Sequence, residues 1–427
     1  MRIESLALVA RTALIVVVCT ISSDAQSPEP ASGDWPFWRG PHRNGTAEAG
    51  QQPPVEWSDT HNVAWKAAVP GRGHSSPTVV GNRVLLTTAE GDTQRQSVLC
   101  YDRATGELLW RRTVNEGGLP RKIHTRNTHA SSTISAHGGR LFAAFNHHDA
   151  IHVVALDMEG EILWTAEAGS FLPQQYKYGY AASPVLYGGA VIVAGDHDRD
   201  AFLAAFDQET GRLLWKTQRP DLLNWASPVV AKVAGRDQLL ISGCERVSSY
   251  DPKTGQMLWQ TAATTMATSG TIVWQDDLVF AAGGFPKPGV FCLRADGSGE
   301  LLWRNKERIY EQSMLVHDGH LYAITDSGRA FCWQGETGDV QWSERLRGSV
   351  SASPVLAGGN IYISNERGMI WVFRATPEKF QLIAQNQLGA EAFATPSICG
   401  NEIFLRVADR AGLISRKRQE WLYCIKE

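Results

Sequence analysis

The stretch YDRATGELLW, residues 101–110, decides the fold, because its second half returns along the chain. The copies share a glycine four residues before a tryptophan: MEGEILW (158–164), ETGRLLW (209–215), KTGQMLW (253–259), GSGELLW (297–303) and ETGDVQW (336–342). Glycine lets the chain turn tightly with a positive φ. The tryptophan can then lie over the turn region and pack its large apolar ring between neighbouring repeats.

We therefore assign a structural docking role to six tryptophans, Trp110, Trp164, Trp215, Trp259, Trp303 and Trp342. A stripe of exposed binding residues is the alternative, which their fixed place in every repeat disfavours. Together with Trp65, they recur every 39 to 54 residues. A period of this size, filled with alternating and β-branched residues, is typical of propeller blades.

Each repeat predicts four antiparallel strands joined by tight turns, which make one blade. Eight first strands open at hydroxyl residues, namely Ser76, Thr133, Ser183, Ser227, Thr271, Ser313, Ser353 and Thr395. The eighth repeat ends at WLYCIKE, which matches a third strand, and residues 62–69 near the N-terminus are the best candidate for its missing fourth strand. The sequence thus predicts an all-β, eight-bladed β-propeller over residues 57–427, closed by that N-terminal strand, which leaves no free sheet edge.

The N-terminus predicts export. Arg2 precedes an apolar run over residues 12–21, and Ser23-Asp24-Ala25 offers the small residues of a cleavage site. We expect a signal peptide over residues 1–25, cut after Ala25, followed by an N-terminal extension over residues 26–56. An uncleaved anchor is the alternative, but the run is short for a membrane span. The chain is then periplasmic or secreted, and we expect a monomer with no transmembrane segment after cleavage.

The charge composition and the cysteine positions bear on the type of partner and on disulfide formation. The 41 basic and 44 acidic residues give a net charge of -3, which argues against a nucleic-acid partner. Four cysteines, Cys100, Cys292, Cys332 and Cys424, occupy the same place in their third strands. Equivalent points of separate blades are too far apart to form a disulfide. We therefore expect mostly or wholly free thiols.

The repeats YDRATGELLW, AFDQETGRLLW and SYDPKTGQMLW resemble the Asp-x-x-Thr-Gly-x-x-x-Trp motif of the pyrroloquinoline-quinone (PQQ) repeat propellers. The resemblance covers roughly residues 35–427, although the motif is incomplete in RADGSGELLW and absent from FRATPEKFQLI. It implies one of two branches. Quinoprotein dehydrogenases hold PQQ and calcium over the central channel beside an adjacent cysteine pair, which this chain lacks. The compact blades look more like the non-catalytic, BamB-like branch, whose propellers bind partners through loops on one face.

Irregular polar and aromatic residues gather on the face formed by the links into each first strand and the hairpins between second and third strands. The candidate ligand or partner residues lie over blades 1 to 4: Arg72, His74, His124, Arg126, His129, His147, His148, Tyr178, Tyr180, Asp196, His197, Asp198, Trp225 and Glu245. Histidine and aspartate loops can bind metal or transfer protons, but their spacing matches no zinc or EF-hand pattern. A solvated loop face with incidental histidines, a binding pocket and a catalytic metal site all stay open, and the metal is unknown.

The mouth of the channel follows the same register. The first-strand positions equivalent to His74 are Ser131, Ala181, Trp225, Ser269, Glu311, Ser351 and Phe393. A quinone site would need stacking aromatic rings with carboxylates or amides for calcium, and only Trp225 and Glu311 suit such roles. We therefore expect no cofactor. The expected function is non-catalytic binding or scaffolding of a protein, glycan or small ligand; a PQQ- and calcium-dependent oxidoreductase is the alternative.

Overall fold

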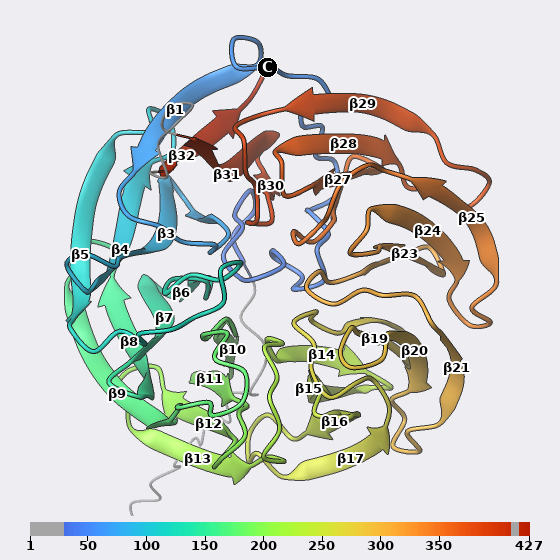
Figure 1. Cartoon of the computed structure of the whole chain (residues 1–427), viewed down its shortest axis with the longest axis horizontal. Coiled ribbons are helices and arrows are strands. Elements are labelled where there is room, and N and C mark those ends of the chain that lie inside the picture. Colours follow the sequence, from blue (N-terminus) through green and yellow to red (C-terminus); the bar gives the residue numbers. More distant parts are fainter. Residues whose placement is uncertain (1–29, 411–417) are drawn as a thin grey trace, which may run out of the picture.

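The computed structural model describes residues 30–410 and 418–427, which form eight four-stranded sheets around one axis (Figure 1). Every neighbouring strand pair is antiparallel, so the predicted eight-bladed propeller is confirmed. The predicted signal peptide lies outside the described residues. In the described part of the chain, no helix has the length and apolar character that crossing a membrane requires.

Each blade takes four strands that run outward from the axis. Blades 1 to 4 are β2 (Thr78–Val80), β3 (Arg83–Glu90), β4 (Arg95–Asp102), β5 (Leu108–Glu116); β6 (Ser135–His137), β7 (Arg140–His147), β8 (Ala150–Asp157), β9 (Ile162–Ser170); β10 (Val185–Tyr187), β11 (Ala190–Gly195), β12 (Phe202–Asp207), β13 (Leu213–Gln218); and β14 (Val229–Val233), β15 (Arg236–Gly243), β16 (Arg246–Tyr250), β17 (Met257–Ala262). Blades 5 to 8 are β18 (Val273–Gln275), β19 (Leu278–Gly283), β20 (Gly289–Arg294), β21 (Leu301–Asn305); β22 (Leu315–His317), β23 (His320–Ile324), β24 (Arg329–Gln334), β25 (Val340–Arg345); β26 (Val355–Ala357), β27 (Asn360–Ser364), β28 (Met369–Arg374), β29 (Leu382–Gln387); and β30 (Ser397–Cys399), β31 (Glu402–Arg410), β32 (Arg418–Ile425) with β1 (Val63–Val69).

Blade 8 closes the ring as the sequence predicted. The N-terminal strand β1 pairs antiparallel with β32, from Val69 opposite Glu420 to Val63 opposite Ile425. The two chain ends of the propeller therefore share one sheet (Figure 1). Closure of this kind protects edges that would otherwise invite pairing with other chains.

Hydroxyl groups join the blades at the inner ring. In six seams, the backbone N–H of one first-strand opening residue donates to the hydroxyl of its counterpart in the next blade, at 2.8 to 3.0 Å. The exceptions are the seam from blade 4 to 5, where Thr271 accepts from Trp38 instead, and the seam from blade 8 to 1, where the Ser76 hydroxyl is buried without a protein partner. The recurring Ser or Thr thus satisfies a buried amide at each of these six seams.

Indoles join the blades at the outer strands. The turn that each indole covers belongs to the next blade, not to its own: a Cβ added at Gly160 would lie 2.8 Å from the ring of Trp110. Gly106, Gly211, Gly255 and Gly338 receive the indoles of Trp65, Trp164, Trp215 and Trp303 in the same way. Five indole N–H groups also donate to a carbonyl oxygen of the next blade, those of Trp65, Trp110, Trp164, Trp303 and Trp342. Glycine is therefore needed at these turns for space as well as for φ.

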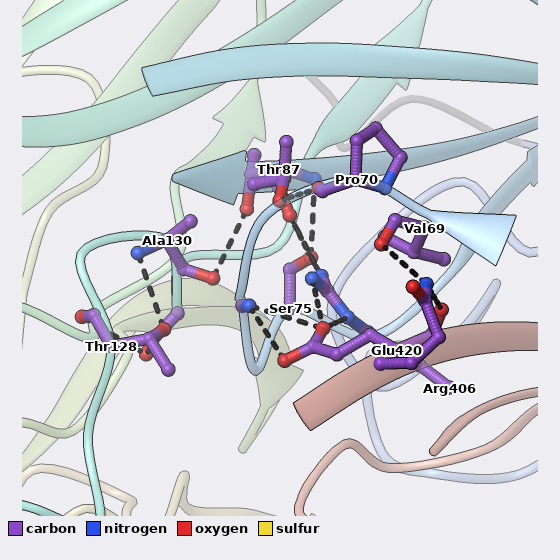
Figure 2. A network of polar contacts seen from close by, with 12 residues as sticks. Val69, Pro70, Ser75, Thr87, Thr128, Ala130, Arg406 and Glu420 are labelled. Carbon is purple, nitrogen blue, oxygen red and sulfur yellow. Dashed lines mark hydrogen bonds and ion pairs between the residues drawn. The ribbon is translucent and has the colours of Figure 1, made fainter. Parts of the chain in front are cut away.

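A buried ion pair stabilises the closing seam between blades 8 and 1 (Figure 2). The Arg406 guanidinium donates to Glu420 at 2.6 Å, and the two side chains are 2% and 5% exposed. Arg406 also donates to the Ser75 hydroxyl and to the Thr87 carbonyl oxygen of blade 1, while Glu420 accepts from the Gly73 N–H. A buried pair of this kind is tolerated because further hydrogen bonds to blade 1 compensate part of its loss of hydration.

The N-terminal extension lies near the axis (Figure 1) and pairs with the first strands of two blades. Trp35 pairs with Val79 of blade 1, and Thr46 forms a bridge with Leu356 of blade 7. Between them, Arg39 is buried and donates to backbone oxygens of blades 6 and 7. The extension therefore connects blade 1 with blades 6 and 7 across one end of the central channel.

The blade cores are apolar, and the cysteines belong to them. The six cysteines of the described residues are buried and unpaired: Cys100, Cys244, Cys292, Cys332, Cys399 and Cys424. Burial is the main cause that raises the pKa of every one of these thiols. They are neutral at physiological pH, as apolar core residues are.

Candidate ligand-binding funnel

A cavity of about 530 Å³ lies on the propeller axis and opens on the loop face. All eight positions that share the register of His74 line it: His74, Ser131, Ala181, Trp225, Ser269, Glu311, Ser351 and Phe393. The short first strands bring these residues together, because each blade places its first strand innermost. The cavity, called the funnel below, therefore draws on every blade, beyond the four to which the sequence assigned the site.

The floor of the funnel is formed by Trp38 and by inner-ring hydroxyls. Trp38 comes from the N-terminal extension, and its indole N–H donates to Thr271 at 2.8 Å. The hydroxyl residues of the inner ring that line the funnel are Ser76, Ser183, Ser227, Ser353 and Thr395. The extension therefore closes the channel below, and a ligand would enter from the loop face.

Aromatic rings form one wall, from blade 3 to blade 5. Tyr178 packs against Trp225 at a ring-centroid distance of 5.3 Å, and Tyr176 packs against Tyr178 at 5.7 Å and Phe285 at 5.5 Å. The Trp225 indole N–H donates to the Gly179 carbonyl oxygen, which holds the ring in place. Rings in contact at these distances make a continuous, rigid apolar surface.

An arginine spans the mouth. Arg126, from the link into blade 2, donates to the Ser351 hydroxyl at 2.9 Å and pairs with Glu366, both of blade 7. Its guanidinium also lies 3.5 Å from Glu311 of blade 6. Blades 6 and 7 lie across the ring from blade 2 (Figure 1). The side chain of Arg126 therefore ties opposite edges of the funnel together.

Three further ionisable groups of the lining, Arg308, Asp326 and His74, are paired or neutral. Arg308 donates to Asp326 at 3.1 Å, while burial is the largest influence on the Asp326 carboxyl and raises its pKa. His74 stacks on Phe393 at 4.5 Å. Burial, and then three nearby arginines, hold the pKa of His74 well below its usual range, so the imidazole is neutral at pH 7. The funnel is therefore close to charge-balanced.

Five of the candidate residues from the sequence line the funnel: His74, His124, Arg126, Tyr178 and Trp225. The others lie outside its lining: Arg72, His129, His147, His148, Tyr180, Asp196, His197, Asp198 and Glu245. Asp196 accepts both hydrogen bonds of a bidentate pair with Arg219, and the two side chains are 2% and 0% exposed. His197 is buried and bonded to the Ser170 carbonyl oxygen. These two residues join elements of the fold.

Sequence reasoning missed several funnel residues, namely Trp38, Phe285, Arg308, Tyr310 and Asp326. Four of them lie in the links and hairpins of blades 5 and 6, which are the same kinds of loop that gave the candidates of blades 1 to 4. Treating all eight blades alike would have found them. Trp38 had no such signal, because it precedes the first repeat.

The sequence model described as "Outer membrane protein assembly factor BamB" matches residues 94–285 and 267–379, together more than half of the chain. The chain belongs to the BamB family. The BamB of Bordetella pertussis is 24% identical over 356 residues, which cover 78% of this chain and 81% of that protein. The solved BamB structure from Moraxella catarrhalis has a TM-score of 0.60 and 14% identity, covering 84% of this chain and 96% of that one.

The fold is also shared with enzymes. A europium-containing methanol dehydrogenase has a TM-score of 0.63 and 12% identity, covering 90% of this chain and 91% of the dehydrogenase. At such identity, the likeness concerns the fold alone.

The enzyme branch implies PQQ with calcium. Such a site needs oxygen ligands for the calcium ion and free cationic groups for the PQQ carboxylates. Calcium takes about six to eight oxygen ligands. Among residues 30–410 and 418–427, no three His, Cys, Asp or Glu side chains are grouped as metal ligands would be. PQQ carries carboxylates, whereas Arg126 and Arg308 of the lining are already paired with acids. The residues present do not fit a calcium–PQQ site.

Proposed function

We propose that this chain is an exported, non-catalytic binding or scaffold propeller that recognises its ligand or partner through the funnel and its rim. The observation that carries the proposal is a cavity on the propeller axis with an aromatic wall and with Trp38 in its floor. Concave, largely apolar sites with a few placed polar groups are the usual form of binding pockets.

Binding is favoured over catalysis by the state of the titratable groups. A general base must be free to reach a substrate proton. In the funnel lining, the carboxylates Glu311 and Asp326 each face an arginine, and His74 stacks on Phe393. The two carboxylates therefore form ion pairs at the rim, and His74 packs against an aromatic ring.

The relatives named as outer membrane protein assembly factors suggest the setting. We propose that the chain is exported and takes part in the assembly of outer-membrane proteins, with the loop face as its contact surface. The test is co-purification of outer-membrane assembly proteins with the full chain and with the triple variant His124→Ala, Arg126→Ala, Tyr178→Ala.

The matched control alters three exposed residues of the opposite turn face, Glu107, Lys253 and Gln256, to alanine. We expect the rim variant to lose the co-purified proteins and the turn-face variant to keep them. Loss with the turn-face variant alone would place the contact surface on the other side of the propeller and reject the assignment.

A PQQ-dependent oxidoreductase is the alternative function, because methanol dehydrogenase shares the fold. The test adds PQQ and Ca²⁺ to the purified chain and follows quinone absorbance and dye-linked oxidation of alcohols and sugars. We expect neither a stoichiometric quinone complex nor turnover. Observation of both would replace the binding function with an enzymatic one.

A further inference from the structure

We propose that the funnel binds a neutral carbohydrate, with one pyranose ring against the aromatic wall and its hydroxyl groups on the hydroxyl floor. This inference rests on the proposed binding function and names the chemical class of the ligand. It follows from three features of the funnel: the wall, the floor and the charge balance.

The wall suits the apolar face of a sugar ring. Tyr176, Tyr178, Trp225 and Phe285 line the funnel as one contiguous group of rings. The face of an aromatic ring carries partial negative charge, which attracts the polarised C–H groups of a pyranose. Trp225 is 6% exposed and fixed by its hydrogen bond to Gly179, so this surface exists before a ligand arrives.

The floor supplies hydrogen-bond donors. Ser183, Ser227, Ser353 and Thr395 each use a lone pair to accept an N–H from the preceding blade. A hydroxyl has one proton and two acceptor sites, so the O–H of each of these residues stays available to a ligand oxygen. Ser76 also belongs to the lining, and its buried hydroxyl has no hydrogen-bond partner within the protein.

The charges select a neutral ligand. The lining contains two arginines and two carboxylates, and each arginine already faces an acid: Arg126 faces Glu311, and Arg308 faces Asp326. An anionic ligand would find no unpaired cation, and burying a charge without a partner is costly. A polyol can instead accept from the guanidinium and donate to the carboxylates, without disturbing either pair.

The size and shape fit one or two sugar units. Small-ligand sites have volumes of roughly 300–1,000 Å³, and the funnel holds about 530 Å³. Because Trp38 closes the bottom, a glycan would insert a terminal unit from the loop face.

The test is calorimetric titration of the full chain with glucose, N-acetylglucosamine, maltose, glucuronate and choline. We expect at least one neutral sugar to bind with a Kd of roughly millimolar or tighter, and glucuronate and choline not to bind. Trp225→Ala should weaken the sugar about tenfold or more. Ser76→Ala should also weaken it, with an unchanged melting temperature, because no protein group depends on that hydroxyl.

Trp421→Ala is the matched control, since this half-buried tryptophan lies on β32 outside the funnel lining. It should leave sugar affinity unchanged. The proposal is overturned if none of the neutral sugars binds, if choline or glucuronate binds instead, or if Ser76→Ala and folded Trp225→Ala bind sugar as tightly as wild type. If one of these results is obtained while assembly proteins still co-purify with wild type and not with the rim variant, the sugar ligand is rejected. The proposed binding function is then retained.

Discussion

Three histidines of one hairpin show how the fold controls the chemistry of single residues. The rings of His147 and His152 stack at 3.9 Å, and Nδ1 of His147 lies 3.0 Å from Nδ1 of His148. Burial, and then the charges that His152 and His148 would carry, lower the pKa of His147 to about 3. The surroundings of His147 therefore favour its neutral imidazole at physiological pH.

This shift predicts an acid-sensitive contribution to stability. In the unfolded chain, His147 takes up a proton near pH 6.5, whereas in the folded protein it does so near pH 3. Between these values the unfolded state binds more protons, so the free energy of unfolding should fall as pH falls from about 6.5 to about 3. The variant His147→Gln should lose less stability over this window, measured by urea denaturation at several pH values.

The difference in free energy of unfolding between wild type and His147→Gln at pH 8 serves as the reference, because His147 is then neutral in both the folded and the unfolded state. Curves for wild type and variant that stay parallel down to pH 3 would contradict the assignment.

At the scale of strands and turns, the glycine of each Gly–Trp repeat serves the preceding blade as much as its own. Glycine can be required at a turn for its positive φ or for the lack of space for a Cβ atom. Two glycines of blade 2 separate these two requirements. Gly139 and Gly160 both have positive φ, +76° and +84°. A Cβ at Gly139 would meet nothing within 4 Å, whereas one at Gly160 would lie 2.8 Å from the Trp110 indole.

We expect Gly139→Ala to lower the free energy of unfolding by roughly 1–2 kcal/mol, the usual cost of a left-handed alanine. Gly160→Ala should cost clearly more, because it also displaces the indole from the blade seam. Denaturant unfolding of both variants measures the difference. Equal losses would mean that the turns need glycine for φ alone.

The seam between blades 6 and 7 shows how a repeat can depart from its pattern. Blade 7 has no Gly–Trp pair, yet Trp342 still donates its indole N–H to the Thr376 carbonyl oxygen. Phe380 packs against the Trp342 ring at 5.5 Å. An aromatic residue in the turn therefore replaces the glycine cradle at this seam.

For the whole molecule, ring closure and channel closure are separate tasks of the N-terminal region. β1 completes blade 8, whereas Trp38 and Arg39 of the extension close the channel and tie blades 5, 6 and 7 together. A chain that begins at residue 56 should fold with a lower melting temperature, because it loses only the extension. A chain that begins at residue 70 should aggregate, because it leaves β32 as an unpaired edge.

Size-exclusion chromatography and thermal unfolding of the two truncated chains distinguish these outcomes. A monomeric, cooperatively unfolding chain 70–427 would show that β1 is dispensable for closure.

The register of the funnel could be predicted because it repeats. Each blade contributes an equivalent first-strand residue, so aligning the repeats located Trp225, Glu311 and Phe393 on the axis. The link across the mouth could not be predicted, since Arg126 and Glu366 are 240 residues apart and meet only because the ring closes. The same holds for Trp38, which lies outside the repeats.

The blade count, the strand order and the closing strand could be predicted from the sequence, because turns, strand alternation and the Gly–Trp spacing are local features that recur along the chain. Which loop residues form a site became clear from the folded structure. Asp196 and His197 are polar residues in a loop, yet packing buries them within the protein, while Arg126 and Tyr178 are brought to the funnel. The physical reason is that a side chain's surroundings depend on contacts between distant segments, and local sequence does not encode those contacts.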